Sequence, residues 1–449
     1  MSYKRFASGL VFPLHERLKG HDSVALRRRL ERSQWLEPEA IAAEQAERLR
    51  GFLATIGARV PYWRALFQEL GFDPQALRSV ADLHALPLLD KATIREHADA
   101  MKAEGHGSLT RYNTGGSSGQ PLVFYIGKAR KSHDVAAKWR ATRWWDVDIG
   151  DREAVIWGSP IEHSTQDRLR QWRDRLLRST LLPAFEMSED KLDGFVVWLR
   201  RERPTMLFGY PSALSYIARH AAKRGLRLDD LGVRVAFVTS ERLYDEQRTL
   251  IESAFNCRVA NGYGGRDAGF IAHECPAGGL HLSAEDIVVE IVGADGQPLP
   301  AGQAGEIVVT HLATADFPFV RYRTGDIAVL DDRRCACGRG LPMLRELQGR
   351  STDFVVAADG TVMHGLALIY ILRDLPGIER FKVTQETRTH TRVELVPEAS
   401  FDRSRLPSIV SSFQKRLGAE VQVTVDVVAA IAPERSGKYR YIVSHALQG

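Results

Sequence analysis

Apolar and polar positions alternate along the chain with a period that changes twice. Residues 14–70 place apolar side chains at helical spacing among strong helix formers, and they predict helices. Beyond residue 122, short apolar runs alternate with amphipathic stretches. The runs at 122–125, 154–158, 205–210 and 233–239 predict strands, and the stretches at 128–145, 165–179, 211–224 and 245–255 predict helices. This alternation predicts parallel βαβ units, which bind ligands at the carboxyl ends of their strands.

From Asp286 the period changes to two. Runs at 287–292, 305–310 and 326–330 predict strands with no helix between them, and so an antiparallel sheet or small barrel at the end of the αβ region. The last hundred residues or so predict a compact α+β unit. Its helices are expected at 365–373 and 404–417, and its strands at 380–385, 392–396 and 421–428. The expected fold class is α/β, with a large αβ region, an antiparallel β subdomain and a small α+β domain.

Composition narrows the class of protein. The 449 residues are too many for one core and predict two or three domains. A net charge of +5 over this length suits small anionic substrates. The sequence lacks a basic strip interleaved with aromatic residues, so it does not indicate nucleic acid binding. No apolar run approaches the length of a transmembrane helix, and the first residues lack a signal-peptide core. We therefore expect a cytoplasmic protein with reduced cysteines.

The densest candidate for ligand binding is the segment Thr114–Pro121, which precedes a predicted strand. Its three glycines permit positive φ and close ligand approach, while its hydroxyls and N–H groups offer donors to a phosphate. It matches neither the P-loop pattern nor GxGxxG before a helix. A plain Gly/Ser-rich turn is the alternative.

Later stretches offer complementary chemistry. Tyr263 stands between glycines close to Asp267, so it is suited to stacking on a base while the acid holds a cation. Asp326 ends the string Tyr322-Arg-Thr-Gly-Asp, and an acid after a glycine turn can accept from two ribose hydroxyls. Lys438 lies in a Ser-Gly-Lys turn, where a solvated charge is the plain alternative.

These motifs, in this order, resemble the adenylate-forming (acyl-CoA synthetase) superfamily. The helical leader resembles that of phenylacetate–CoA ligase-like and CapK-like proteins. The resemblance implies that Asp326 holds the ribose of ATP, that Asp267 binds Mg²⁺ and that Lys438 is catalytic. It also implies further ATP-binding residues: Thr114, Gly115, Gly116, Ser117, Ser118 and Gly119 for phosphate, Ser240, Glu241, Tyr263 and Gly264 around adenine, and Arg350 for ribose or phosphate.

The family pattern also implies a division of the chain. Residues 1–349 form the N-terminal adenylate-forming domain, and 350–449 form a small mobile C-terminal lid that carries the catalytic lysine. The chain departs from the pattern at four positions. Gln120 replaces a common loop lysine, and Arg266 and Asp267 replace the usual threonine and glutamate. Thr352 stands where an aspartate often marks the pivot.

The implied function is activation of a carboxylic acid to acyl-AMP with ATP, followed by transfer to CoA. An amide ligase that joins an acid to an amine or amino sugar is the alternative, and a non-catalytic binding relative is disfavoured by Lys438 and Asp326. The residues do not identify the acid. Trp144, Trp157 and Tyr210 are consistent with an aromatic or apolar pocket, and core packing explains them equally well.

Four residues form a candidate zinc site. Cys275 and His281 lie on one Gly-rich segment, and Cys335 and Cys337 lie on another. Zinc takes four such ligands from two short clusters, and a closed set of four makes the metal structural. Some CapK-like relatives show the same Cys…His and Cys-x-Cys pairs. His273 is a rival for the histidine position, and reduced loop cysteines are the plain alternative.

Overall fold

A computed structural model describes residues 3–113, 122–157, 167–184, 186–347, 354–373, 375–431 and 442–446. Its main feature is a hydrogen-bonded sheet of 11 strands in the order β11-β12-β13-β14-β10-β9-β8-β7-β6-β3-β4. The parallel half contains β3 (Glu153–Trp157), β4 (Ser179–Pro183), β6 (Met206–Gly209), β7 (Val235–Thr239) and β8 (Arg258–Gly265). The antiparallel half contains β9 (Gly269–Glu274), β10 (Leu280–Leu282), β11 (Ile287–Val292), β12 (Ala304–His311), β13 (Tyr322–Asp331) and β14 (Met343–Leu347).

Helices supply the crossovers of the parallel half. They are α8 (Asp167–Leu177), α9 (Glu189–Glu202), α10 (Pro211–Lys223) and α11 (Asp245–Phe255). Local sequence fixes their ends. The Ser188 side chain accepts from the Lys191 amide at the start of α9, and Pro211 begins α10 directly after β6. The apolar faces of α9–α11 form one core with the parallel strands.

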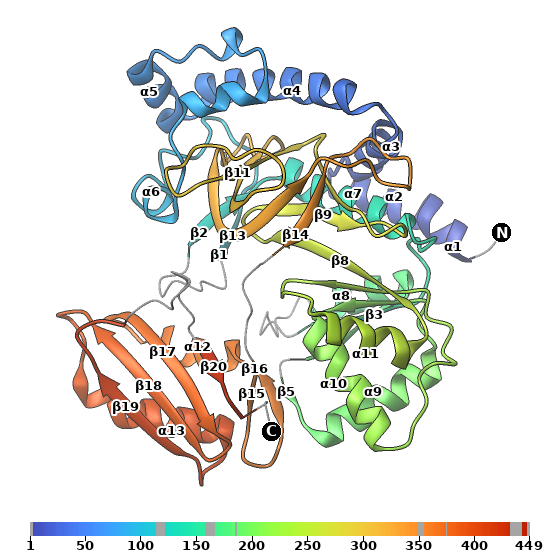
Figure 1. The fold of residues 1–449 in the computed structure, drawn as a ribbon, viewed down its shortest axis with the longest axis vertical. Coiled ribbons are helices and arrows are strands. Elements are labelled where there is room, and N and C mark those ends of the chain that lie inside the picture. Colours follow the sequence, from blue (N-terminus) through green and yellow to red (C-terminus); the bar gives the residue numbers. More distant parts are fainter. Residues whose placement is uncertain are drawn as a thin grey trace.

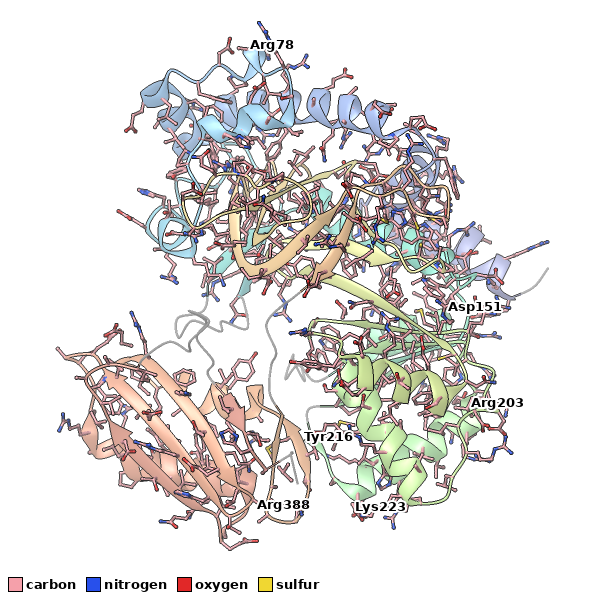
Figure 2. All side chains as sticks on the ribbon, viewed as in Figure 1. Arg78, Asp151, Arg203, Tyr216, Lys223 and Arg388 are labelled. Atoms are coloured by element: carbon pink, nitrogen blue, oxygen red, sulfur yellow. The ribbon has the colours of Figure 1, made fainter. Side chains whose placement is uncertain are left out.

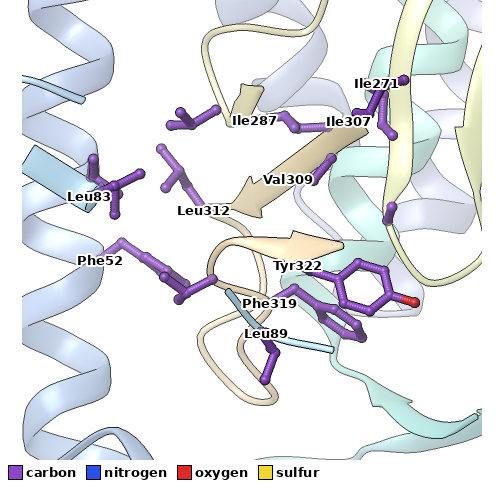
Figure 3. Packing of buried hydrophobic residues seen from close by; sticks show 14 of the residues in the cluster. Phe52, Leu83, Leu89, Ile271, Ile287, Ile307, Val309, Leu312, Phe319 and Tyr322 are labelled. Atoms are coloured by element: carbon purple, nitrogen blue, oxygen red, sulfur yellow. The ribbon is translucent and has the colours of Figure 1, made fainter. Parts of the chain in front are cut away.

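The N-terminal helices cover the antiparallel half. They are α1 (Tyr3–Phe6), the π-helical η1 (Ala7–Val11), α2 (Phe12–Leu18), α3 (Ser23–Ser33), α4 (Pro38–Arg59), α5 (Pro61–Leu70), the 3₁₀ turns η2 (Pro74–Ala76) and η3 (Val80–Ala85), and α6 (Lys91–Glu96). Figure 1 shows α4 lying across the end of the molecule above β11. Figure 3 shows the core between them, where Phe52 of α4 lies near Leu312, Phe319 and Leu89. Among the described residues, no helix combines the length and apolar character needed to cross a bilayer.

A hairpin and one further helix bracket the predicted phosphate loop. The hairpin pairs β1 (Thr110–Asn113) with β2 (Val123–Ile126), and Asn113 lies opposite Val123. The described residues on either side of segment 114–121 therefore lie close together. The helix α7 (Lys128–Arg143) follows and packs on α3 and β9.

The C-terminal region has its own core and lies apart from the rest in Figure 1. Its four-stranded sheet has the order β19-β18-β17-β20. Its elements are β15 (Phe354–Val356), β16 (Val362–His364), α12 (Leu366–Arg373), β17 (Ile378–Thr387), β18 (His390–Pro397), η4 (Arg403–Arg405), α13 (Leu406–Leu417), β19 (Gln422–Val427) and β20 (Ile442–Ser444). The pairing of β16 with β5 (Glu186–Met187) joins the C-terminal region to the larger region.

The predicted α/β fold class is confirmed, including the helical leader, the parallel αβ region and the C-terminal α+β unit. Two details differ from the predictions. The antiparallel strands continue the parallel sheet through the β8–β9 pair instead of forming a separate sheet or barrel. Residues 261–265, expected as a turn after a strand, are part of β8 itself, because they pair with both β7 and β9.

Candidate functional site

A tyrosine and a carboxylate meet where β8 and β13 approach each other. Tyr263 is 8% exposed, and its hydroxyl donates to Asp326 Oδ2 at 3.0 Å. Thr324 supports the pair, because its hydroxyl accepts from the Asp326 amide at 3.1 Å. Burial and the neighbouring carboxylate raise the pKa of Tyr263 well above its ordinary value. The tyrosine therefore stays protonated and acts as a donor that orients Asp326.

Asp267 lies in the turn that follows β8. The Tyr322 hydroxyl donates to Asp267 Oδ2 at 2.6 Å, and the Ala268 amide donates to Oδ1 at 3.0 Å. Tyr322 and Asp326 are both on β13, so this strand carries one acid of the site and contacts the other, Asp267. A carboxylate offers about four lone-pair sites, so these two donors leave capacity for a metal ion.

A buried arginine of α7 holds the backbone of this turn. Arg130 is 1% exposed, and its Nη1 donates to the carbonyl of Asp267 at 3.1 Å. Its Nε donates to Asp134 Oδ1 at 3.0 Å, which balances the buried charge. A Cβ added at Gly269 would lie 3.0 Å from Arg130 Nη2, and the φ of Gly269 is +93°. Glycine is therefore required where the turn enters β9.

The stem of the predicted phosphate loop lies beside the same turn. Arg266 Nη1 lies 3.5 Å from the carbonyl oxygen of Asn113, the last residue of β1. Asn113, the residue before segment 114–121, is therefore in contact with Arg266, the immediate neighbour of Asp267. Thr114, Gly115, Gly116, Ser117, Ser118 and Gly119 are outside the described residues, as are Arg350 and Lys438. Their predicted roles stay predictions.

Ser240 and Glu241 follow β7, whose last residue Thr239 pairs with Gly262 of β8. They therefore lie one strand away from Tyr263. Ser240 has a φ of +73°, and Glu241 Oε2 accepts from the Ser212 hydroxyl at the start of α10. Gly264 allows β8 and β9 to come together, because a Cβ there would collide with the carbonyl oxygen of Gly269.

Aromatic rings lie at the carboxyl ends of the adjacent parallel strands. Trp157 of β3 stacks on Tyr210 with ring centroids 4.5 Å apart, and Tyr210 is 4% exposed. Trp157 also stacks on Phe208 of β6, and Phe208 on Phe237 of β7. Trp144 is not part of this stack, because its ring meets the edge of His281. The predicted aromatic set is therefore divided between two places.

The predicted metal ligands come together. The ligand atoms of Cys275, His281, Cys335 and Cys337 all lie within 4.8 Å of one another. The Cys275 and Cys335 sulfurs are 3.6 Å apart, and Cys337 Sγ is 3.2 Å from His281 Nε2. His281 Nδ1 lies 3.2 Å from the Leu341 carbonyl, so it can donate there while Nε2 faces the sulfurs.

Burial and hydrogen bonds shift the pKa values of the cluster in different directions. Burial lowers the pKa of His281 to about 4, so its ring is neutral as a metal ligand must be, and raises the pKa of Cys275 to about 12. At Cys337, burial acts to raise the pKa, but hydrogen bonds with Arg339, Cys335 and Cys275 together outweigh it and the pKa is lowered. Gly279 is required beside the cluster, because a Cβ there would lie 2.7 Å from Cys335 Sγ.

His273, the rival ligand, lies opposite His281 on the neighbouring strand, but its ring is not part of the cluster. It is 1% exposed on β9, and its ring stacks on Phe270 with centroids 5.4 Å apart.

A second group of possible ligand atoms, His133, Asp134 and His311, lies within 4.8 Å. Asp134 already accepts from the Arg130 guanidinium at 3.0 Å, which places a fixed positive charge beside the group. This charge and the pairing of Asp134 disfavour a metal ion here.

Sequence reasoning missed three residues that contact the acids or their turn. Arg130 lies in the predicted helix 128–145 but was not singled out, and Tyr322 appeared only as the first residue of a motif. Glu306 accepts from the Gly325 amide at 3.1 Å and pairs with Arg323, so it shapes the bend before Asp326. The available signal for Arg130 was its spacing with His133 and Arg140, which places three polar residues on the buried face of α7.

Comparisons with known proteins give two family matches and several relatives. Residues 114–315 match the family of AMP-binding enzymes, and residues 355–445 match the CapK C-terminal domain. The phenylacetate-coenzyme A ligase of Thermus thermophilus is 26% identical over 396 residues, which are 86% of this chain and 85% of that protein. Protein CapK of Staphylococcus aureus is 23% identical over 378 residues, which are 82% of this chain and 81% of that protein.

The fold has a solved counterpart. The crystal structure of 2-hydroxyisobutyryl-CoA ligase with 2-HIB-AMP and CoA matches with a TM-score of 0.66 and 20% identity, over 92% of this chain and 91% of that one. The two family matches together cover most of this chain, at residues 114–315 and 355–445. The chain therefore belongs to the adenylate-forming superfamily, in its phenylacetate–CoA ligase-like and CapK-like branch, and is by family a carboxylate-adenylating ligase.

Proposed function

We propose that the protein activates a carboxylic acid with ATP and transfers the acyl group to CoA. A carboxylate oxygen attacks the α-phosphorus of ATP, and the bond to pyrophosphate breaks. The thiol of CoA then attacks the acyl carbon and releases AMP. The observation that carries the proposal is the convergence of Asp326, Tyr263, Asp267 and the stem of segment 114–121 at one end of the sheet.

Within this proposal each group has one role. Asp326, oriented by Tyr263, accepts from the ribose hydroxyls. Asp267 holds the Mg²⁺ that accompanies the triphosphate, and Lys438 stabilises charge developing in the first step. The glycine- and hydroxyl-rich residues 114–119 bind the phosphates. With Gln120 in place of a lysine, that binding relies more on backbone N–H groups.

The Cys/His cluster has a separate, structural role, and we propose that it binds one zinc ion. Two thiolates at about 2.3 Å from zinc stand about 3.8 Å apart in a tetrahedral site. The Cys275–Cys335 sulfur separation of 3.6 Å fits this geometry and is too long for a disulfide. Four protein ligands leave no open coordination position, so the ion would stabilise and not catalyse.

We further propose that the chain divides at residues 349 and 350, with the C-terminal part acting as a lid that delivers Lys438. The separate core of this part supports the division. The pairing of Val362 with Met187 connects the lid to the larger domain. A rotation of the lid must therefore break the β5–β16 pairing or carry β5 with it.

The acceptor is tested by product analysis. Purified protein is incubated with ATP, Mg²⁺ and a panel of aliphatic and aromatic carboxylic acids, with CoA or with amines and amino sugars, and products are identified by mass spectrometry. We expect AMP and an acyl-CoA to appear together only when one acid and CoA are both present. An amide product with an amine, and none with CoA, would replace the proposed acceptor while keeping the adenylation step.

A further inference from the structure

A row of large apolar side chains faces solvent along the N-terminal helical rod formed by α1, η1 and α2. Phe6, Leu10, Leu14 and Leu18 are 39%, 57%, 55% and 80% exposed. They recur every four residues. In a regular α-helix such a row drifts by about 40° at each step. The π-helical turn at Ala7–Val11 holds more residues per turn, so it reduces this drift and keeps the row on one side.

The opposite side of the rod is fixed to the protein. Phe12 meets Trp139 of α7 edge to face, with centroids 5.1 Å apart. Ala7 packs on Gly150, where an added Cβ would lie 2.5 Å from the Ala7 side chain. Lys4 pairs with Asp151 at 2.8 Å, and Asp151 is labelled beside the rod in Figure 2. The apolar row therefore cannot turn inward to find cover.

Basic side chains accompany the apolar row. Arg5, Arg17 and Lys19 are exposed. Glu16 is the one acidic residue between residues 3 and 19, and it is 3% exposed and turned toward Ser23 and His21. Residues 3–19 thus carry four lysine and arginine side chains and one buried acid, which gives the rod a net positive charge.

The neighbouring helix α8 extends the same chemistry. The Tyr3 hydroxyl donates to the Leu176 carbonyl at 2.6 Å, and the Arg178 guanidinium lies 3.8 Å from the centre of the Tyr3 ring. These contacts place the end of α8 against the rod. In α8, Trp172 is 71% exposed and Leu176 is 47% exposed.

We propose that this face, comprising Phe6, Leu10, Leu14 and Leu18 with Arg17 and Lys19, docks on an anionic lipid surface. Helices with leucine and aromatic side chains on one side and lysine and arginine beside them lie in the membrane interface, where anionic headgroups attract the cations. A second copy of the chain fits less well. A symmetric contact would bring the net positive charge of the rod against the same charge on the second copy.

The test is co-sedimentation of the full chain with phosphatidylcholine vesicles that contain or lack phosphatidylglycerol. We expect binding to the anionic vesicles only, weakened by added salt. The double variant Leu10→Ser/Leu14→Ser should lower the partition coefficient by about tenfold or more. The variant Arg17→Glu/Lys19→Glu should lower it by a similar factor, because each basic residue near the surface contributes about fivefold.

The matched control is Leu70→Ser/Leu226→Ser, which removes two other exposed leucines (46% and 39% exposed) and should bind vesicles like the wild type.

Failure of the wild type to bind anionic vesicles would overturn the proposal. So would a dimer in sedimentation equilibrium that the Leu10/Leu14 variant dissociates without any lipid binding, because a second copy would then cover the face. If the leucine variant does not fold, the charge variant decides. Pyrophosphate release without lipid is measured in parallel, so loss of docking is distinguished from failure of the proposed function.

Discussion

The protonated hydroxyl of Tyr263 orients Asp326, so removal of this one oxygen atom should weaken the binding of ATP. Tyr263→Phe keeps the ring and removes the hydroxyl that holds Asp326 Oδ2 at 3.0 Å. A net hydrogen bond is worth about 0.5–1.5 kcal/mol, so we expect the Kd for ATP to rise about two- to tenfold. Tyr62→Phe, at a tyrosine of α5, is the control. An unchanged Kd would mean that the tyrosine does not help to orient Asp326, the acid that we propose binds ribose.

Lys438 is assigned by the family pattern, and its role can be tested one half-reaction at a time. Lys438→Ala should slow acyl-AMP formation about a hundredfold to a thousandfold, because a preorganised charge of this kind is worth about 3–4 kcal/mol in the transition state. Transfer from supplied acyl-AMP to CoA should be largely retained. Stopped reactions for each half measure this, with Lys415→Ala of α13 as control. Equal loss in both halves would contradict the assignment.

At the scale of elements, α7 positions the acid-bearing turn through Arg130. Removing one partner of a buried ion pair costs about 3–5 kcal/mol, so Arg130→Gln should destabilise the protein by an amount of that order. In the folded fraction we expect a higher Mg²⁺ concentration for half-maximal activity, because the backbone of Asp267 loses its donor. Arg130→Lys should restore part of both properties. Lys128→Gln, at the exposed start of the same helix, should change neither.

If Arg130→Gln lowers stability but leaves the Mg²⁺ dependence unchanged, Arg130 supports the core and does not position Asp267. Denaturant unfolding and activity against Mg²⁺ concentration separate the two outcomes.

The Cys/His cluster joins three segments, with Cys275 after β9, His281 on β10 and the loop with Cys335 and Cys337 before β14. Cys335→Ser should remove the bound zinc and lower the free energy of unfolding by at least about 3 kcal/mol. Elemental analysis and thermal unfolding test this. Cys257→Ser, a cysteine outside the cluster, should retain the metal. Wild-type protein that contains no zinc and is fully stable would contradict the assignment.

Elements with a clear period were predictable from sequence, and those defined by tertiary pairing were not. The helix at 245–255 and the strand at 287–292 have the predicted bounds, because their apolar spacing is set locally. The Gly-rich 261–265 segment looked like a turn, yet β7 and β9 pair with it on both sides. Spacing also predicted that the four zinc-ligand candidates lie together, since they come from two short stretches of sequence, 275–281 and 335–337. The spacing of Arg130 with His133 and Arg140 indicates a buried polar face, but it does not reveal the partners of Arg130, which are backbone carbonyls 136 and 137 residues away.

For the whole molecule, we expect carboxylate adenylation to be independent of the acceptor. The most direct measurement is exchange of labelled pyrophosphate into ATP, which reports reversible acyl-AMP formation alone. We predict exchange that requires Mg²⁺ and one class of carboxylic acid, proceeds without CoA, and is lost in Asp326→Ala while that variant stays folded. Folded protein that binds ATP but supports no acid-dependent exchange across a broad panel of acids would contradict the proposed adenylation.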